Sequence, residues 1–247
     1  MFLREIFFIN KYLKGHPRSV LIKKNIIGSF LVKGISVLVS FILVPMVLNY
    51  VDKVEYGIWL TVSAVIHWFG FFNLGLGNGL RNRLTEAIVQ EDFEKGKKQV
   101  STTYAIISFI TLGLFILFAI SSQFLDFAIV FNADPSYSDE LQKVVFVVFS
   151  FFMLRLVLQL LTSVVLAFQK SALSSAYELV SSLVSLVVIF ILTKTTSGSL
   201  LYIAMVYSIS PAVVLFLSSI YFYRGTFRKI RPSLKYIDFS YSRDLMN

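Results

Sequence analysis

Six stretches of the chain are predominantly apolar, and each reaches the length of about 20 residues that a helix needs to cross a lipid bilayer. They cover residues 26–50, 56–77, 100–120, 144–168, 172–193 and 200–223. Hydrocarbon offers no partners to backbone N–H and C=O groups, so apolar runs of this length are helical. Only 15% of the residues are charged, whereas soluble domains carry about 25%. The sequence therefore predicts an all-α integral membrane protein, a bundle of six transmembrane helices.

Lysine and arginine residues are concentrated on one side of the predicted membrane. Six precede the first run, five lie between the second and third, Lys170 lies between the fourth and fifth, and six follow the sixth. The opposite loops contain only Lys53, Lys143 and Lys194. Loops rich in lysine and arginine stay in the cytoplasm, so both termini are predicted to be cytoplasmic. Orientation then accounts for the net charge of +9, and we expect no nucleic-acid partner.

The predicted spans divide the chain into three parts. Residues 1–25 form a basic lead-in with apolar side chains along one side, which is typical of a helix lying at the membrane surface. Residues 26–223 form the six-helix lobe, and residues 224–247 form a basic cytoplasmic tail. Within the lobe, residues 78–99 mix acidic and basic side chains, and we expect a short surface helix there.

Three glycines alternate with other residues in the stretch GLGNGLRNRLTEA, which begins at Gly75. Similar spacing occurs in loops that bind phosphate groups, but those loops need a preceding strand and a soluble α/β domain. The apolar composition argues against that context, so a phosphate-binding loop is the less favoured alternative. We expect the glycines to end the second membrane helix at its cytoplasmic end. Arg81 and Arg83 are then expected to contact anionic lipid headgroups or a pyrophosphate there.

Polar residues recur at helical spacing within four of the runs, so each of these helices has one polar side. On these sides lie Lys33 in the first run, His67 in the second, and Arg155 with Gln159 in the fourth. The fifth run has a continuous polar seam made of Ser171, Ser174, Ser175, Glu178, Ser181, Ser182 and Ser185. Polar sides within a bilayer face another helix or a water-filled cavity, and small residues also allow close helix packing. Arg155, Lys33, Gln159 and His67 are the candidates to line a cationic cavity, and for His67 a hydrogen bond between helices is the favoured alternative.

Three ionisable residues, Lys33, Arg155 and Glu178, lie within the spans, where a charge at the helix centre costs about 2.5–3.5 kcal/mol. Lys33 and Glu178 are predicted at a similar depth, which allows an ion pair, and Glu178 is also a candidate for coupling to an ion. Arg155 lies near the middle of the bilayer, and its guanidinium is suited to two hydrogen bonds with a phosphate. The alternatives are that Arg155 pairs with Glu178 or bonds to carbonyls of a broken helix, and that Lys33 extends to the headgroups.

No pattern typical of an intramembrane enzyme is found in the sequence. It contains neither a GxSxG nor an HExxH motif, and its two histidines are His16 and His67. Glu178 is the one acid within a span, so a pair of catalytic carboxylates is missing. The lack of cysteine excludes disulfides and thiolate metal sites. We expect no catalytic activity, no metal and no cofactor.

Several segments resemble a known family. The first begins at Lys24 and reads KNIIGSFLVKGISVLVSFILVPMVLNYVDKVEYGIWLTV; Pro45 lies near the outer end of the span, and a tight loop leads to Tyr56-Gly57-Ile58-Trp59. The later segments, around the second-to-third loop, read NLGLGNGLRNRLTEA and KKQVSTTY. The chain thus resembles the bacterial polysaccharide biosynthesis proteins, the O-antigen unit flippases of the multidrug/oligosaccharidyl-lipid/polysaccharide exporter superfamily.

This resemblance implies that the chain moves an undecaprenyl-pyrophosphate-linked oligosaccharide from the inner to the outer leaflet of the cytoplasmic membrane by alternating access. It also implies a cationic cavity between two lobes, of which the six predicted spans are the N-terminal one. A second lobe, a second copy, or a polymerase or glycosyltransferase partner is then expected to complete the cavity. Two alternatives stay open. One is a membrane scaffold or accessory protein of polysaccharide synthesis that transports nothing, and the other is a drug or ion exporter of the same superfamily.

Overall fold

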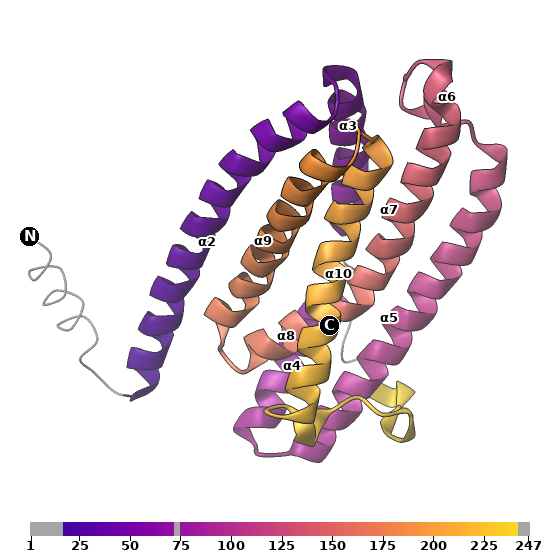
Figure 1. Ribbon diagram of the computed structural model, residues 1–247. Coiled ribbons are helices and arrows are strands. Elements are labelled where there is room, and N and C mark those ends of the chain that lie inside the picture. The colour runs from indigo at the N-terminus through magenta and orange to yellow at the C-terminus, as the bar shows by residue number, and fades with distance from the viewer. Residues whose placement is uncertain (1–16, 72–74, 242–247) are drawn as a thin grey trace, which may run out of the picture.

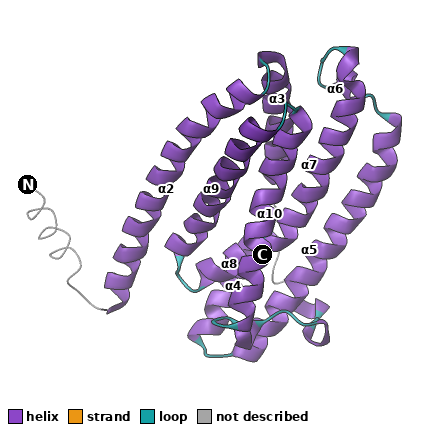
Figure 2. Ribbon diagram, viewed as in Figure 1, coloured by secondary structure: helices purple, strands orange, loops and turns teal. Residues whose placement is uncertain are grey.

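The computed structural model describes residues 17–71 and 75–241, and within these ranges it contains helices and loops but no strands (Figures 1 and 2). The helices are α2 (Pro17–Tyr50), α3 (Lys53–Phe71), α4 (Leu76–Val89), α5 (Phe93–Ser121), α6 (Phe127–Val130), α7 (Ser138–Leu158), α8 (Leu160–Ala167), α9 (Ser171–Thr195) and α10 (Leu200–Arg224). Short 3-10 turns lie at Ser122–Phe124, Pro135–Tyr137, Arg228–Ile230, Leu234–Tyr236 and Phe239–Tyr241. The predicted all-α fold class is confirmed. Most of the predicted lead-in, residues 1–25, lies outside the described residues, and residues 17–25 form the start of α2.

Five helical segments of the described chain are long and apolar enough to cross a membrane. They are Lys23–Tyr50, Phe93–Phe124, Pro135–Ala167, Ser171–Thr195 and Leu200–Arg224. These match the first, third, fourth, fifth and sixth predicted spans, so this is a multi-pass membrane protein. The second predicted span corresponds to α3, which is shorter, has Lys53 and Glu55 in its first turn and is not among the five. A count of six spans therefore stays a prediction.

The second predicted span ends earlier than the sequence indicated. α3 ends at Phe71, and Gly75 caps the start of a new helix, α4. Gly75 has a φ of 66°, in the left-handed region that a residue without a Cβ adopts at little cost. Gly77 and Gly79 lie within α4, and the Gly79 N–H donates to the Gly75 carbonyl at 2.8 Å. The prediction that these glycines end the second helix was wrong: they begin α4, because the left-handed turn comes at the first of them.

A surface helix within residues 78–99 is confirmed in part. α4 buries Leu80 and Leu84 and leaves Arg81 exposed, so it has one apolar and one polar side. The remainder of that segment belongs to α5, which starts earlier than predicted. Asp92 caps this start, since its carboxylate accepts a hydrogen bond from the Lys95 N–H at 2.9 Å.

The long helices run up and down between two ends of the molecule, as Figure 1 shows. α6 and the loops that join α2 to α3 and α9 to α10 lie at one end, which we call the α6 end. α4, α8 and the C-terminal tail lie at the other, the α4 end. Lys53, Lys143 and Lys194 belong to the α6 end, and the basic segments after α3, α8 and α10 belong to the α4 end. The predicted separation of basic residues is present in the fold, while the orientation in a membrane stays a prediction.

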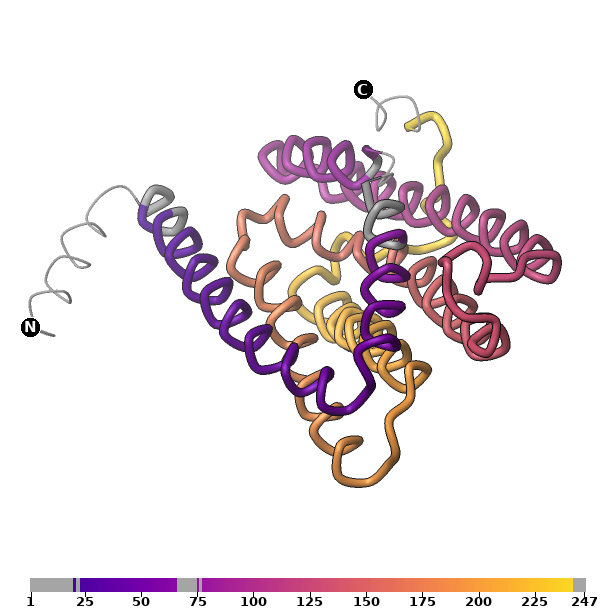
Figure 3. Tube along the Cα trace, turned by 90° about the horizontal axis from the view of Figure 1, so that it is seen from above, coloured from indigo at the N-terminus to yellow at the C-terminus, as the bar shows by residue number. Residues whose placement is uncertain are grey.

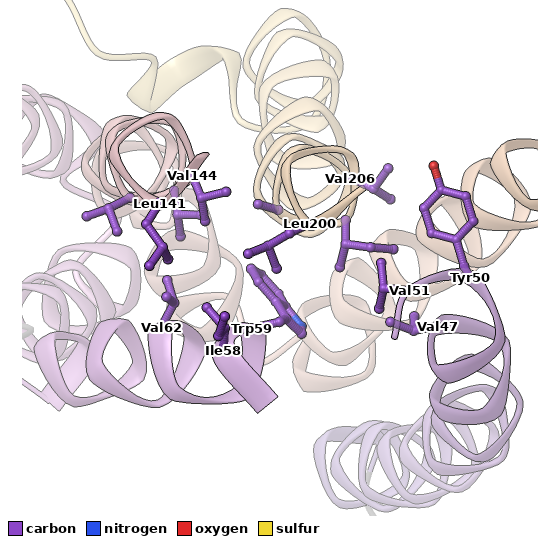
Figure 4. Close-up of a cluster of buried hydrophobic side chains, with 14 of the residues drawn as sticks. Val47, Tyr50, Val51, Ile58, Trp59, Val62, Leu141, Val144, Leu200 and Val206 are labelled. Atoms are coloured by element: carbon purple, nitrogen blue, oxygen red, sulfur yellow. The ribbon is translucent and has the colours of Figure 1, made fainter. Parts of the chain in front are cut away.

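The helices pack through two clusters of buried apolar side chains, one at each end of the molecule. The cluster at the α6 end, shown in Figure 4, includes Val47, Val62, Leu141, Val144 and Leu200. The cluster at the α4 end includes Leu80, Leu84, Leu161, Val164, Phe227 and Ile230. α2 stands at the edge of the bundle beside α9, as the view from above shows (Figure 3). The polar cavity described below lies between the inner helices.

Hydrogen bonds join α2 to α9 at one end and to the loop after α9 at the other. The Ser29 hydroxyl donates to the Ser171 hydroxyl at 3.1 Å, so one member of the predicted serine seam serves helix packing. At the α6 end, the Tyr50 hydroxyl lies 2.7 Å from the Thr196 hydroxyl and donates to the Ser197 carbonyl at 2.9 Å. These bonds fix the end of α2 against the loop that joins α9 to α10.

The C-terminal tail folds against the start of α5. Phe227 and Ile230 are each 1% exposed. The Asp238 N–H donates to the Thr102 hydroxyl at 2.9 Å, and that hydroxyl donates to the Asp238 carbonyl at 3.2 Å. The Asp238 carboxylate accepts from the Ser240 hydroxyl at 2.6 Å, which lowers the pKa of the carboxyl group. The segment predicted as a basic tail is therefore, as far as residue 241, a packed part of the α4 end.

We expect Thr102→Val to loosen the tail. Both backbone groups of Asp238 would lose their partner at a part-buried position, and a lost hydrogen bond costs about 0.5–1.5 kcal/mol. Thr103→Val is the matched control, because Thr103 is also fully buried but its hydroxyl donates within α5, to the Gln99 carbonyl at 2.8 Å. Hydrogen–deuterium exchange of residues 233–241 should be faster in Thr102→Val alone. Unchanged exchange in that variant would contradict the docking.

Candidate functional site: a polar cavity between five helices

A cavity of about 520 Å³ lies between α3, α7, α8, α9 and α10. Three of the predicted site residues, Arg155, Gln159 and Glu178, line it together. Four serines of the predicted seam also line it, namely Ser174, Ser181, Ser182 and Ser185. Its volume falls within the range of about 300–1,000 Å³ that is typical of ligand pockets. The polar sides of the fourth and fifth predicted spans therefore face one another across a cavity.

Arg155 reaches the cavity from the last turn of α7, just before a break in the helix. Gln159 separates α7 from α8. The Thr162 hydroxyl donates to the Gln159 carbonyl at 2.6 Å, and the Thr162 N–H donates to the same carbonyl at 2.9 Å. A neighbouring hydroxyl thus bonds the carbonyl at the break, as a membrane interior requires. The predicted span 144–168 is confirmed in place, within the apolar segment Pro135–Ala167, and its helix is interrupted at Gln159.

The Arg155 guanidinium has no hydrogen bond or ion pair with any described residue. Glu178 lines the same cavity, and its charge acts on the guanidinium, but the two side chains form no ion pair. In the described part of the chain Lys33 and Glu178 are not paired either. Lys33 is exposed on α2 and does not line the cavity, whereas Glu178 turns from α9 toward α7 and α10. The ion pair predicted from their similar depth is therefore not formed, because Lys33 is exposed on α2 whereas Glu178 faces the cavity.

The remaining predicted site residues lie elsewhere. His67 belongs to α3, but its side chain lies outside the described residues. Arg81 is exposed on α4, and Arg83 contacts Glu86 on the same helix at 3.5 Å. Both arginines lie at the α4 end, where the sequence placed them, and neither lines the cavity. The cationic cavity of the prediction therefore rests, among the described residues, on Arg155.

An aromatic pair in the cavity lining was missed from the sequence. Trp59 of α3 and Tyr207 of α10 stack with their ring centroids 5.2 Å apart and their planes 24° apart. Ser63 lies one helical turn after Trp59 and also lines the cavity. The spacing of Trp59 and Ser63 was a signal that both share one side of α3. No sequence signal connects them to Tyr207, which lies far along the chain.

A sequence model of the polysaccharide biosynthesis protein family matches residues 22–246, nearly the whole chain. The chain belongs to this family. Searches of the curated proteins and of the solved structures found no match. For a polysaccharide biosynthesis protein with long apolar helices, membership indicates a role at the membrane in polysaccharide synthesis or export.

The cavity of this polysaccharide biosynthesis protein is suited to an anionic ligand that also carries hydroxyl groups. Arg155 offers up to five N–H donors, and Gln159 adds an amide. The serine hydroxyls can donate to or accept from a sugar. In the described ranges, no three histidine, aspartate or glutamate side chains gather as metal ligands.

Proposed function

We propose that this protein transfers an undecaprenyl-pyrophosphate-linked oligosaccharide across the bacterial cytoplasmic membrane, for the synthesis of a surface polysaccharide such as O-antigen, capsule or exopolysaccharide. One observation carries the proposal. The Arg155 guanidinium has no hydrogen bond or ion pair with any described residue, and it lines a cavity between apolar helices. A charge at the centre of a membrane helix costs about 2.5–3.5 kcal/mol. A pyrophosphate held by two hydrogen bonds would offset that cost.

Glu178 has a second role in this proposal. It faces the same cavity as Arg155 and acts on its charge. A pyrophosphate that approaches Arg155 also approaches Glu178, and like charges repel. Binding is therefore stronger when Glu178 is neutralised by a proton or a metal cation. This makes Glu178 the candidate for coupling transport to an ion.

The proposed movement is alternating access with both termini in the cytoplasm. The concentration of basic residues at the α4 end supports this orientation, because basic loops stay in the cytoplasm. A second lobe, a second copy of the chain or a polymerase or glycosyltransferase partner would complete the transport path. We assign no bond-making or bond-breaking step to this chain.

Native mass spectrometry of the purified chain in mild detergent tests the binding step. After incubation with undecaprenyl pyrophosphate, we expect one lipid to remain on the wild type and none on Arg155→Gln. Arg224→Gln is the matched control, since Arg224 lies at the exposed end of α10. Equal retention by wild type and Arg155→Gln would contradict the role of Arg155.

Two other functions predict different spectra. A scaffold or accessory protein would retain no pyrophosphate lipid. A drug or ion exporter of the same superfamily is favoured by one observation, the exposed Glu178 carboxylate in the cavity. Such an exporter would bind a lipophilic cation such as tetraphenylphosphonium, and Glu178→Gln would abolish that binding. Retention of the cation and not of the lipid would replace the proposed function with this one.

A further inference from the structure

The two ends of the cavity differ in chemistry. A rise of about 1.5 Å per residue puts Arg155 about 26 Å from the start of α7, and Glu178 about 26 Å from the end of α9. Both of those helix termini lie at the α6 end. The same rise puts Trp59 and Tyr207 only about 9–11 Å from the α6 end, along α3 and α10. We call the first pair the arginine end of the cavity and the second pair the aromatic end.

The aromatic end presents a rigid apolar surface without charge. Trp59 and Tyr207 stack at 5.2 Å between ring centroids, and both line the cavity. The face of an aromatic ring carries partial negative charge and attracts the C–H groups of a sugar ring. Tryptophan and tyrosine also give a large contact area with little loss of side-chain freedom. A pair of this kind suits the apolar face of a pyranose.

Two serine hydroxyls that line the cavity have no hydrogen bond with any described residue. Some hydroxyls of α9 bond to the preceding turn, as Ser181 donates to the Tyr177 carbonyl at 2.7 Å. Ser185 departs from it: the residue is 3% exposed, lines the cavity and has no hydrogen bond with any described residue. Ser208, next to Tyr207, also lines the cavity without such a bond. Both hydroxyls line the cavity, so they are available to bond to a ligand that carries hydrogen-bonding groups.

We infer that the aromatic end is a sugar-binding subsite, in which a sugar ring packs against the stacked pair of Trp59 and Tyr207 and its hydroxyls bond to Ser185 and Ser208. The inference rests on the proposed function, in which Arg155 holds the pyrophosphate. The two ends lie about 15 Å apart along the helix axes, which leaves room for the pyrophosphate and its sugars to lie end to end. The sugars then point toward the α6 end, ahead of the lipid phosphate. The subsite makes the chain selective for lipids that carry sugars.

Trp59 itself provides the measurement. The chain has two tryptophans, so a Trp68→Phe background leaves Trp59 as the fluorophore. The full chain in detergent would be titrated with two probes, a short-chain polyprenyl pyrophosphate and the same lipid carrying a trisaccharide of N-acetylhexosamines. We expect the trisaccharide probe to change Trp59 emission and to bind about two- to tenfold less tightly to Ser185→Ala or Ser208→Ala, the effect of one lost hydrogen bond. The sugar-free probe should bind these variants as it binds the background chain.

Ser210→Ala is the matched control, because Ser210 is a buried serine of α10 that does not line the cavity. Equal affinity of the trisaccharide probe for background, Ser185→Ala and Ser208→Ala would overturn the subsite. An equal loss for both probes would overturn it as well. Arg155→Gln separates the two proposals, since it should weaken both probes alike. If Arg155→Gln has no effect while Ser185→Ala is selective for sugar, the phosphate anchor fails and the sugar subsite stands.

Discussion

Arg155→Gln should lower the rate of transport of a lipid-linked oligosaccharide by about tenfold to a hundredfold. Hydrogen bonds to charged groups contribute about 1.5–3 kcal/mol, and 1.4 kcal/mol is about a tenfold change. The glutamine keeps a polar side chain in the cavity but cannot hold a pyrophosphate by a charged, two-pronged contact. The assay uses vesicles with the lipid-linked oligosaccharide in the inner leaflet and measures how fast an external lectin binds it.

The same substitution should leave the fold intact. Arg155 has no hydrogen bond or ion pair with any described residue, so its removal breaks no such contact. Removing a cation from an apolar bundle also relieves a desolvation cost. Arg224→Gln serves as the control for the loss of an arginine at the α4 end. A wild-type transport rate in Arg155→Gln, at equal protein level, would favour the scaffold function over the flippase.

Gly198→Ala should destabilise the protein, with a midpoint of thermal unfolding lower by about 4–10 °C. Gly198 lies in the loop between α9 and α10, and a Cβ there would overlap the backbone carbonyl oxygen of Tyr50. Backbone at the end of α2 cannot move aside as the tip of a side chain can. The shift would also pull Tyr50 from its bonds with Thr196 and Ser197.

Gly113→Ala is the matched control for this prediction. Gly113 lies within α5, and no heavy atom lies within 4 Å of the position that its Cβ would take. Alanine favours a helix interior over glycine by about 1 kcal/mol, so this variant should be as stable as the wild type or slightly more so. The comparison is made in one detergent by heating and then measuring the fraction of monodisperse protein. Equal stability of the two variants would contradict the prediction, because it would show that the end of α2 and the loop can move apart at little cost.

The local features of the fold were predictable from the sequence. Five long apolar segments lie where the polarity pattern put them, because a membrane helix is specified by the length and composition of one continuous stretch. Most basic residues lie at the α4 end, as predicted, because the order of the spans along the chain decides at which end each loop lies. Arg155, in the last turn of α7, and Gln159, just after it, face the same side because they are one helical turn apart. Arg155 and Gln159 line one cavity with Glu178, as expected if the polar sides of the fourth and fifth predicted spans face each other.

Other features depended on local geometry that polarity does not encode. Gly75, Gly77 and Gly79 were predicted to end a helix and instead begin α4. At the break between α7 and α8, the Thr162 hydroxyl donates to the Gln159 carbonyl. Neither feature changes the apolar content of its segment, so hydropathy could not reveal them.

The sequence by itself determined that this chain is a multi-pass helical membrane protein with a few ionisable residues within its spans. Only the tertiary structure decided which of those residues meet. It separated Lys33 from Glu178, placed Arg155 without a partner among the described residues, and stacked Trp59 on Tyr207. The physical reason is that helix packing joins sides of helices that are distant in the chain. The rotation of each helix about its own axis is set by side-chain fit with its neighbours, which no single stretch of sequence contains.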